Sequence, residues 1–399
     1  MSRLSFLERL LEGAAVEWKK LGEVGEFIRG NGLQKKDFTE TGVPAIHYGQ
    51  IYTRYGLSTD RTLTFVSEEL AKKLRIANKN DLLIATTSEN DEDVLKPLAW
   101  LGEKAAISGD MMLFRHQQNV KYLAYYFQTE VFQKQKAKYI TGTKVRRVSS
   151  ESLAKLQIPI PPLHVQGEIV RILDNFTLLT AELTAELTAR RRQYAYYRDR
   201  LLTFTEEQAE WKTLGEVAKI GTGSHDTQDA IEDGDYIFYA RGREPLKLDV
   251  FDFDETAIIT AGDGAGVGKV FHYVQGKYAL HQRAYRIVPN ENMEARFIYH
   301  YITSYFYAYI QKASVSSSVT SLRRPMFLKF PIPIPPLVEQ ERIVAILDKF
   351  DALTHSLTEG LPREIALRQK QYEHYRDMLL SFPKENPAYL EVTPTQKRK

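Results

Sequence analysis

The stretch IPIPPLHVQGEIVRILDNF at residues 158–176 returns as IPIPPLVEQERIVAILDKF at residues 332–350. Two flanking signatures recur in the same order: EWK-LGEV at 17–24 and 210–217, and QY--YRD-LL-F at 193–204 and 371–382. A fixed order of repeated signatures indicates a duplicated architecture. We therefore predict two halves, each with a variable globule followed by a repeated helix.

Each repeated segment predicts an extended approach and then a long helix. Prolines at positions 159, 161 and 162 disfavour helix, because proline lacks a backbone donor and restricts the residue before it. Beyond them, steps of four and three residues mark a coiled-coil seam, which is apolar or aromatic at eight of ten positions in the first copy. The first seam consists of Ile169, Leu173, Phe176, Thr180, Leu183, Leu187, Arg190, Tyr194, Tyr197 and Leu201. The second consists of Ile343, Leu347, Phe350, Thr354, Leu357, Leu361, Ile365, Arg368, Tyr372, Tyr375 and Leu379. Two such helices in one chain are predicted to pack antiparallel.

The second seam contains one irregular spacing, where we predict a kink or a break. Two steps of four residues follow one another, from Leu357 to Leu361 and from Leu361 to Ile365. Such an insertion locally unwinds a coiled coil, and Gly360 and Pro362 both stand at this point.

The stretches between the repeated signatures differ in sequence and predict two mixed globules. Strand-like runs occur at 81–86 and 256–260, and turn signals occur in both stretches. Aromatic runs at 122–127 and 297–302 stand at matching places, so we expect one helix, packed in the core, in both copies. The predicted fold class is α+β, with two mixed α/β globules separated by two long antiparallel coiled-coil helices in an internal pseudo-twofold repeat. The expected domains are a first globule at 1–157, a central helix at 158–205, a second globule at 206–330, a C-terminal helix at 331–385 and a disordered basic tail at 386–399.

Composition narrows the function classes. With 399 residues, 43% hydrophobic and 26% charged, the chain resembles soluble proteins of two or three domains. The absence of cysteine excludes disulfides, thiol nucleophiles and cysteine-based zinc sites, and it fits a reducing compartment. Acidic residues interrupt the segment 1–18, so no signal peptide is expected. We therefore expect a cytoplasmic protein without a membrane segment.

Known catalytic motifs are incomplete in this chain. GDGAGVGKV at 262–270 has Asp263 where a phosphate loop needs glycine and Val270 where it needs Ser or Thr, so we interpret it as a turn between strands. The Pro-Pro pairs follow Ile160 and Ile334, not the Asn or Asp of DNA amino-methyltransferases. The nine histidines lack zinc-binding spacing. We expect a non-catalytic binding protein with no metal and no cofactor of its own.

Two acid-free basic segments lie at equivalent places and are candidates for binding a polyanion. The first contains Lys134, Lys136, Lys138, Lys144, Arg146 and Arg147. The second, at 311–329, contains Lys312, Arg323, Arg324 and Lys329 together with several serines, whose hydroxyls can contact phosphate oxygens. The net charge of +3 decides nothing, because nucleic-acid binding depends on where charge lies. Residues 226–255 carry ten acids and three basic residues, so we expect this face to point away from a polyanion.

Taken together, the repeated signatures resemble those of the specificity subunits of bacterial Type I restriction-modification enzymes. The resemblance covers essentially the whole chain and includes the Thr-Ala-Glu-Leu repeat at 180–187. It implies two target recognition domains, each reading one half of a bipartite asymmetric site in double-stranded DNA. It also implies that the helices set the gap and dock two modification (methyltransferase) subunits. S-adenosylmethionine would then belong to those subunits, and ATP and magnesium would belong to restriction subunits with motor and endonuclease activity.

Candidate DNA-binding residues follow from side-chain chemistry, because Arg and Gln make specific contacts to guanine and adenine edges. In the first half they are Tyr48, Gln50, Tyr52, Arg54, Thr87, Asn90, Lys138, Lys144, Arg146 and Arg147. In the second half they are Arg241, Arg243, His281, Gln282, Arg283, Ser317, Arg323 and Arg324. The candidate spacer and partner residues are Leu173, Phe176, Leu183, Leu187, Tyr194, Tyr197, Leu347, Phe350, Leu357, Tyr372 and Tyr375.

Two alternative functions remain open at this stage. A coiled-coil scaffold without DNA readout explains the seams but not the matched basic segments. A stand-alone restriction or modification enzyme requires catalytic residues that the motif search did not recognise.

Overall fold

The computed structural model describes residue 7, residues 9–313 and residues 321–383. The predicted tail at 386–399 therefore lies outside the described residues. Among the helices of the described part, none combines the length and the apolar character that crossing a bilayer requires.

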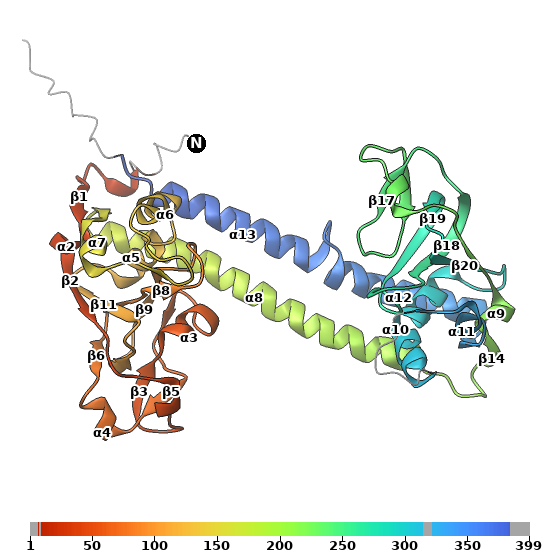
Figure 1. Ribbon diagram of the computed structural model, residues 1–399, viewed down its shortest axis with the longest axis horizontal. Coiled ribbons are helices and arrows are strands. Elements are labelled where there is room, and N and C mark those ends of the chain that lie inside the picture. Colours follow the sequence, from red (N-terminus) through yellow and green to blue (C-terminus); the bar gives the residue numbers. More distant parts are fainter. Residues whose placement is uncertain (1–6, 8, 314–320, 384–399) are drawn as a thin grey trace, which may run out of the picture. The chain divides into compact units, whose positions relative to one another are not determined.

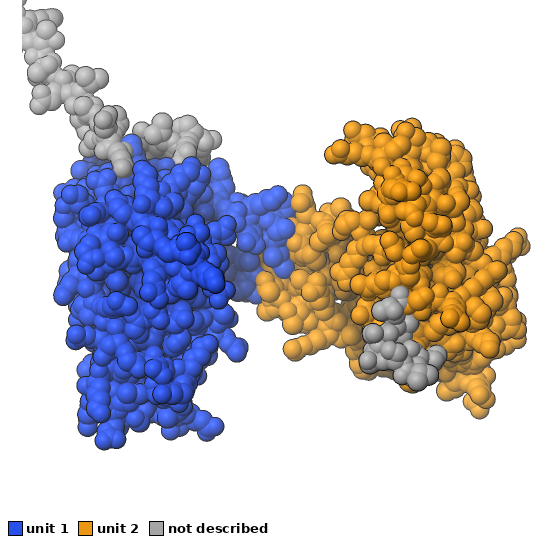
Figure 2. All heavy atoms as spheres, in the orientation of Figure 1, with its two compact units in different colours: residues 1–182, 365–399 blue, residues 183–364 orange. Residues whose placement is uncertain are grey.

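The chain divides into two compact units, shown in different colours in Figure 2. Unit 1 contains residues 1–182 and 365–399, and unit 2 contains residues 183–364. The predicted fold class, two mixed α/β globules joined to long helices, agrees with this architecture (Figure 1).

Unit 1 is built on a five-stranded sheet and a four-stranded sheet with short helices around them (Figure 1). Its strands are β1 (Glu17–Lys20), β2 (Gly25–Arg29), β3 (Val43–Ile46), β4 (Ser58–Thr59), β5 (Thr64–Val66), β6 (Arg75–Asn78), β7 (Leu82–Ala85), β8 (Thr87–Ser88), β9 (Lys96–Trp100), β10 (Lys104–Ile107), β11 (Met111–His116), β12 (Arg146–Arg147) and β13 (Gln157–Ile160). Its helices are α2 (Leu21–Val24), η1 (Lys35–Asp37), α3 (Tyr48–Thr53), α4 (Glu68–Ala71), α5 (Val120–Tyr126), α6 (Glu130–Ala137), α7 (Ser150–Lys155), the first part of α8 (Leu163–Leu201) and most of α13 (Gly360–Leu379). The two sheets have the strand orders β2-β11-β7-β9-β4 and β5-β3-β10-β6.

Unit 2 is built on one six-stranded sheet with the order β15-β20-β18-β19-β16-β17. Its strands are β14 (Glu210–Thr213), β15 (Ala218–Thr222), β16 (Tyr236–Tyr239), β17 (Leu246–Leu248), β18 (Phe253–Ala261), β19 (Phe271–Leu280), β20 (Ala284–Pro289) and β21 (Pro331–Ile334). Its helices, besides the second part of α8, are α9 (Leu214–Val217), η2 (Thr227–Asp229), α10 (Ala295–Ala313), α11 (Arg324–Leu328), α12 (Leu337–His355) and the first residues of α13 (Gly360–Leu379). The glycine-rich run at 262–270 connects β18 to β19, as the motif analysis predicted.

The two repeated signatures that flank each globule pair with each other. In unit 1, β1 and β13 form an antiparallel ribbon in which Trp18 stands opposite Pro159. In unit 2, β14 and β21 form the same ribbon, with Trp211 opposite Pro333. A strand with alternating prolines suits a two-stranded ribbon, because proline cannot donate to a second neighbouring strand. The ribbon therefore closes each globule where the repeated helix begins.

A buried glutamine fixes the start of each repeated helix. In unit 1, Gln166 is fully buried, its Oε1 accepts from Asn119 N at 3.0 Å, and its Nε2 donates to Pro161 O at 2.8 Å. Gln340 makes the same contacts in unit 2, where its Oε1 accepts from Glu294 N at 2.9 Å and its Nε2 donates to a proline carbonyl at 2.9 Å. Each glutamine thereby joins the proline segment, the repeated helix and the aromatic helix of its own globule.

A repeated aspartate adds a second joint between the same two helices in each unit. Asp174 accepts from Tyr125 Oη at 2.7 Å and pairs with Lys121 at 2.5 Å. Asp348 occupies the matching position of the second repeat, where it contacts Arg296 at 2.8 Å and His300 at 2.7 Å. Burial alone raises the pKa of Asp348, but the hydrogen bonds from His300 and Arg296 outweigh it and lower the pKa.

The aromatic helices form the core, as predicted from their matching places. In α5, Tyr122, Tyr125 and Tyr126 are at most 1% exposed and belong to the main cluster of unit 1. In α10, Phe297 and Ile302 are fully buried in the main cluster of unit 2. Core packing is therefore the role of both aromatic runs.

The helical seams form within each unit, and their directions are antiparallel. In unit 1, Leu173 packs in one cluster with Leu379, and Phe176, three residues further along α8, stacks on Tyr375 with ring centroids 5.2 Å apart. In unit 2, Leu202 packs in one cluster with Ile343, and Arg191, earlier in the chain, donates to Thr354 O. In both units, residue numbers rise along one helix while those of its partners fall along the other. This confirms the predicted antiparallel packing.

The break predicted near Gly360 is present. Helix α12 ends at His355 and α13 begins at Gly360, whose φ of +73° favours glycine. The prediction that Leu357 belongs to the seam is wrong, because Leu357 lies between the two helices and is 81% exposed. The heptad count assumed a continuous helix, and the break removes this position from the seam.

We expect Gln166→Leu to lower the stability of unit 1 by about 2–4 kcal/mol, because leucine has a similar size but leaves a buried backbone donor and acceptor unpaired. The measurement is urea unfolding followed by circular dichroism. The control is Gln193→Leu on the same helix, where the glutamine pairs with Arg190 near the surface and the expected cost is below about 1 kcal/mol. Equal losses of unfolding free energy in the two variants would show that the buried glutamine does not hold the globule and the helix together.

Candidate DNA interface

Six candidate residues of the first globule meet around one cavity of unit 1. The cavity has a volume of about 870 Å³ and is lined by α3, by the start of β5 and by β8 with the loop that follows it. We name the first surface after the six candidates in its wall: Tyr48, Gln50, Tyr52, Arg54, Thr87 and Asn90. Two stretches that are about 40 residues apart in the sequence therefore contribute to one surface.

The basic segment of unit 1 joins this surface through a short ribbon. Strand β12 pairs with β8, so that Arg146 stands opposite Ser88 and Arg147 opposite Thr87. Arg146 also forms an ion pair with Asp91 at 2.8 Å. Arg147 is exposed, as are Lys138 and Lys144 in the same segment. The ribbon therefore carries cationic side chains to the edge of the cavity.

The polar groups of several candidates form hydrogen bonds within the protein. Gln50 caps α3, with Oε1 accepting from His47 N at 2.9 Å and Nε2 donating to Thr64 Oγ1 at 3.3 Å. Asn90 exchanges two bonds with Asp93, which close the loop after β8. These side chains shape the surface, and the exposed Arg54 is better placed to contact a ligand.

Tyr52 and Thr87 join the two sides of the first surface. The Tyr52 hydroxyl donates to Thr87 O at 2.8 Å, and Thr87 Oγ1 donates to Asp110 at 3.3 Å. Burial and the nearby charge of Asp93 raise the pKa of Tyr52, so its hydroxyl remains a donor at neutral pH. Both contacts are internal: the first holds α3 against β8, and the second holds β8 to the residue that precedes β11.

Lys136 does not face phosphates, which corrects the prediction made from the basic segment. It is 2% exposed, and its Nζ donates to Glu92 O at 2.8 Å and to Val94 O at 3.0 Å. Burial lowers the pKa of Lys136 to about 8, although the carboxylates of Asp91, Asp93 and Glu92 favour its charged form. Its role is to hold the acidic loop that follows β8 against α6.

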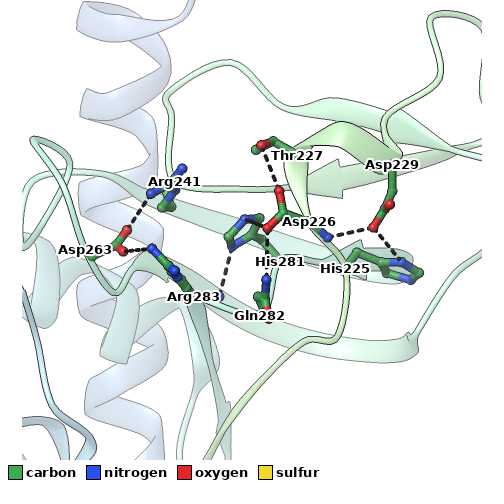
Figure 3. A network of polar contacts seen from close by, with 9 residues as sticks. All are labelled: His225, Asp226, Thr227, Asp229, Arg241, Asp263, His281, Gln282 and Arg283. Carbon is green, nitrogen blue, oxygen red and sulfur yellow. Dashed lines mark hydrogen bonds and ion pairs between the residues drawn. The ribbon is translucent and has the colours of Figure 1, made fainter.

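Four candidates of the second globule, Arg241, His281, Gln282 and Arg283, lie near one another just beyond the ends of β16 and β19 (Figure 3). Arg241 and Arg283 both pair with Asp263, at 3.0 Å and 3.2 Å. Arg241, Arg243 and Asp263 also line a cavity of about 480 Å³. We name the second surface after Arg241, Arg243, Asp263, Gln282 and Arg283.

His281 is buried, which contradicts its predicted role in contacting bases. Its side chain is 1% exposed, and its Nδ1 accepts from Arg283 N at 2.9 Å. Burial and the nearby positive charges of Arg241 and Arg283 lower the pKa of His281, so the ring is neutral at pH 7. The ring positions the backbone of Arg283 and does not reach a ligand.

The second basic segment also approaches this surface. Ser321 forms a β-bridge with Asp263, and Leu322 N donates to Gly262 O at 2.7 Å. Arg323 and Arg324 follow at the start of α11, and both are exposed. The candidate Ser317 lies outside the described residues.

Part of the acidic stretch at 226–255 lies next to candidate residues of the second surface. Asp226 accepts from Gln282 Nε2 at 2.9 Å (Figure 3), and His225 contacts Asp252 at 3.1 Å. Among the described residues, no group of histidine and acidic side chains has the arrangement of a metal site. Asp226 and Asp252 serve instead as partners that position polar groups next to the β19–β20 turn.

The candidate spacer residues mostly lie in the seams. Leu173 and Leu347 are fully buried, Tyr197 is 37% exposed, and the remainder that lie on helices are half-buried: Phe176, Leu183, Leu187, Tyr194, Phe350, Tyr372 and Tyr375. Residue-by-residue inspection of the seams missed an exposed apolar pair at the helix starts. Leu163 is 59% exposed, and Leu337, at the matching position of the second repeat, is 45% exposed. Both leucines end an IPIPPL copy, so the repeat itself marks this pair in the sequence.

We expect Lys136→Met to accelerate cleavage by glutamyl endopeptidase after Glu89 or Glu92 several-fold, because methionine fills the space but leaves two carbonyls without a donor. The measurement is limited proteolysis with mass spectrometry. Lys134→Met is the control, since Lys134 lies on the same helix but is 73% exposed and pairs with Glu130. An unchanged cleavage rate in Lys136→Met would contradict the assigned role.

Comparison with known proteins places this geometry in a family. The sequence model for the Type I restriction modification DNA specificity domain matches residues 15–190 and 206–367. The EcoR124I/EcoR124II specificity subunit of Escherichia coli is 35% identical, over 96% of this chain and 98% of that protein. A putative Type I restriction enzyme specificity subunit of Haemophilus influenzae is 30% identical, over 95% and 98% of the two chains.

Solved structures show the same fold. The S subunit of a Type I restriction-modification system from M. genitalium superposes with a TM-score of 0.59 at 14% identity, covering 93% of this chain and 97% of that one. A chain from a study of Type I system assembly superposes with a TM-score of 0.55 at 16% identity, covering 93% and 98%. The two matched domains and the relatives that span the whole chain show that this protein belongs to the family of Type I restriction-modification specificity subunits.

Proposed function

We propose that each globule reads one half of a bipartite, asymmetric site in double-stranded DNA. A role in DNA recognition follows from the family. The proposal adds that each globule binds its own half-site. The observation that carries it is the pair of surfaces built at equivalent places on a repeated frame. In each unit, the loop after a central strand meets a basic segment, β8 with β12 in unit 1 and Asp263 with Ser321 in unit 2. Different side chains on one frame suit two different half-sites.

The long helices set the distance between the half-sites in this proposal. Helix α8 is continuous over 39 residues and belongs to unit 1 up to residue 182 and to unit 2 from residue 183. At 1.5 Å per residue it is about 58 Å long, which corresponds to about 17 base pairs of B-DNA. A gap fixed by a helix would be independent of the bases within it.

The exposed apolar residues at the helix starts support docking of two partner subunits. Leu163 and Leu337 occupy the same position of the repeat, and Val338 beside Leu337 is 78% exposed. Two copies of one apolar site suit two copies of one partner, which we propose to be a methyltransferase (modification) subunit. Restriction subunits with motor and endonuclease activity would join the same complex.

The chemistry of the complex is assigned to these partners. S-adenosylmethionine would bind the modification subunits, and ATP and magnesium would serve the restriction subunits. This chain would recognise DNA without catalysing a reaction, and its DNA target implies that it works in the cytoplasm.

We test the function by single-molecule sequencing of methylated bases in cells that express this chain with its modification subunit. We expect a new bipartite motif that is absent when the modification subunit is expressed alone. Assembly of the complex without any new motif would contradict the proposal. Direct DNA-binding measurements on that complex would then distinguish a scaffold from a lost recognition function.

We expect one additional Thr-Ala-Glu-Leu unit after Leu187 to lengthen the unread gap by one or two base pairs, because four residues add about 6 Å and about 40° of helix. The measurement is the methylation motif of the variant complex, and both half-sites should stay the same. The control is Ala185→Glu at an exposed position, which keeps the helix length and should keep the gap. An unchanged gap in the insertion variant would refute a helix-set distance.

A further inference from the structure

Two arginines from separate parts of the second globule share one carboxylate. Arg241 follows β16 and Arg283 follows β19, and both side chains point to the carboxylate of Asp263 in Figure 3. Arg241 Nη1 donates to Oδ1 at 3.0 Å, and Arg283 Nη1 donates to Oδ2 at 3.2 Å. One aspartate therefore holds two guanidinium groups next to each other.

The backbone around Asp263 is fixed on both sides. Gly262 N donates to Arg283 O at 2.8 Å, and Gly262 O accepts from Leu322 N at 2.7 Å. A side chain at position 262 would place its Cβ 2.5 Å from Arg283 O, so this close approach requires glycine. The carboxylate of Asp263 is therefore presented from a backbone that two neighbouring segments hold in place.

Arg283 is fixed by a second contact. Its backbone N donates to Nδ1 of the buried His281, while its carbonyl accepts from Gly262 N. The lowered pKa of His281 makes its ring neutral, and the bond from Arg283 N to Nδ1 selects the tautomer whose proton is on Nε2. Both backbone groups of Arg283 are thus bound within the globule.

The guanidinium groups retain free donors. The side chain of Arg241 is 40% exposed and that of Arg283 is 63% exposed. Within the described residues, Asp263 is bonded only to Nη1 of each arginine, and Nη2 and Nε of both have no hydrogen-bonding partner there. Burial alone raises the pKa of Asp263, but its bonds to Arg241 and Arg283 lower it, so the carboxylate stays ionised.

A guanidinium edge with two free donors matches one base in particular. Guanine presents two acceptors, O6 and N7, in the major groove, and arginine binds both at once. A phosphate also accepts such a pair, but this contact carries no sequence information. Fixing the arginine before binding reduces the side-chain entropy that DNA binding would otherwise cost.

We propose that Asp263 is a positioning residue that presents Arg241 and Arg283 as a preformed pair for guanine. The second half-site then contains at least one guanine that this pair reads, and Asp263 itself does not touch the DNA. The inference rests on the proposed function, because it assumes that the second globule reads a half-site. It adds the chemical identity of a base and the residue that makes its recognition selective.

The test uses the methylation motif of the complete complex and compares three variants with the wild-type chain. Asp263→Asn keeps the shape of the side chain and removes the charge that holds the arginines. Arg241→Lys and Arg283→Lys keep the positive charge but remove the two-donor edge. Asp229→Asn is the matched control, since Asp229 lies in the same polar network and pairs with His225, not with either arginine.

We expect the wild-type second half-site to contain a guanine, and we expect Asp263→Asn to reduce selectivity for it at least about fivefold. At least one of the two lysine variants should have the same effect. The first half-site, read by the other globule of the same molecule, should keep its selectivity in every variant. Asp229→Asn should leave both half-sites unchanged.

Three results would overturn the inference. A bipartite motif without guanine in the second half-site would leave the proposed function intact and refute the arginine pair. Full guanine selectivity in Asp263→Asn would show that the carboxylate does not position the arginines, and full selectivity in both lysine variants would point to phosphate contacts. The absence of any motif in the assembled wild-type complex would instead contradict the proposed function, and the inference with it.

Discussion

The buried glutamine at the start of each repeated helix is the contact on which the two units depend. A carboxamide without partners is costly in a protein interior, and both Gln166 and Gln340 are fully buried. Each uses its oxygen for the first turn of the aromatic helix and its amide hydrogens for the proline segment. The same joint therefore connects globule and helix in both halves, and the contacts of Asp174 and Asp348 strengthen it.

This frame leaves the recognition loops free to differ. Each globule is closed by the ribbon of its own repeated signatures, so the strands and loops between them can change without moving the helix. The units show this difference, since unit 1 uses two sheets and unit 2 uses one six-stranded sheet. The candidate surfaces nevertheless form at equivalent places, because in both units a loop that follows a central strand meets the segment before a short helix.

Charge alone is a poor guide to which residues meet a ligand in this protein. Lys136 belongs to the most basic segment of unit 1, but its ammonium group donates hydrogen bonds to two backbone carbonyls. Asp226 and Asp263 belong to acidic or neutral stretches but hold Gln282 and the two arginines of the second surface. The acids make an arginine or glutamine more specific by restricting its orientation before the ligand arrives.

Sequence alone determined the features that depend on local periodicity and on repetition: the two halves, the seams, the buried aromatic helices and the break at Gly360. It also singled out the basic segments and a set of polar residues with the chemistry to read bases. Tertiary structure decided which of these residues meet, because the pairing of Thr87 with Arg147, or of Asp263 with Arg241 and Arg283, joins residues whose separation in sequence carries no periodic signal. It also decided that His281 and Lys136 are buried and that Leu357 is exposed, since burial depends on the path of the whole chain and not on the residue type.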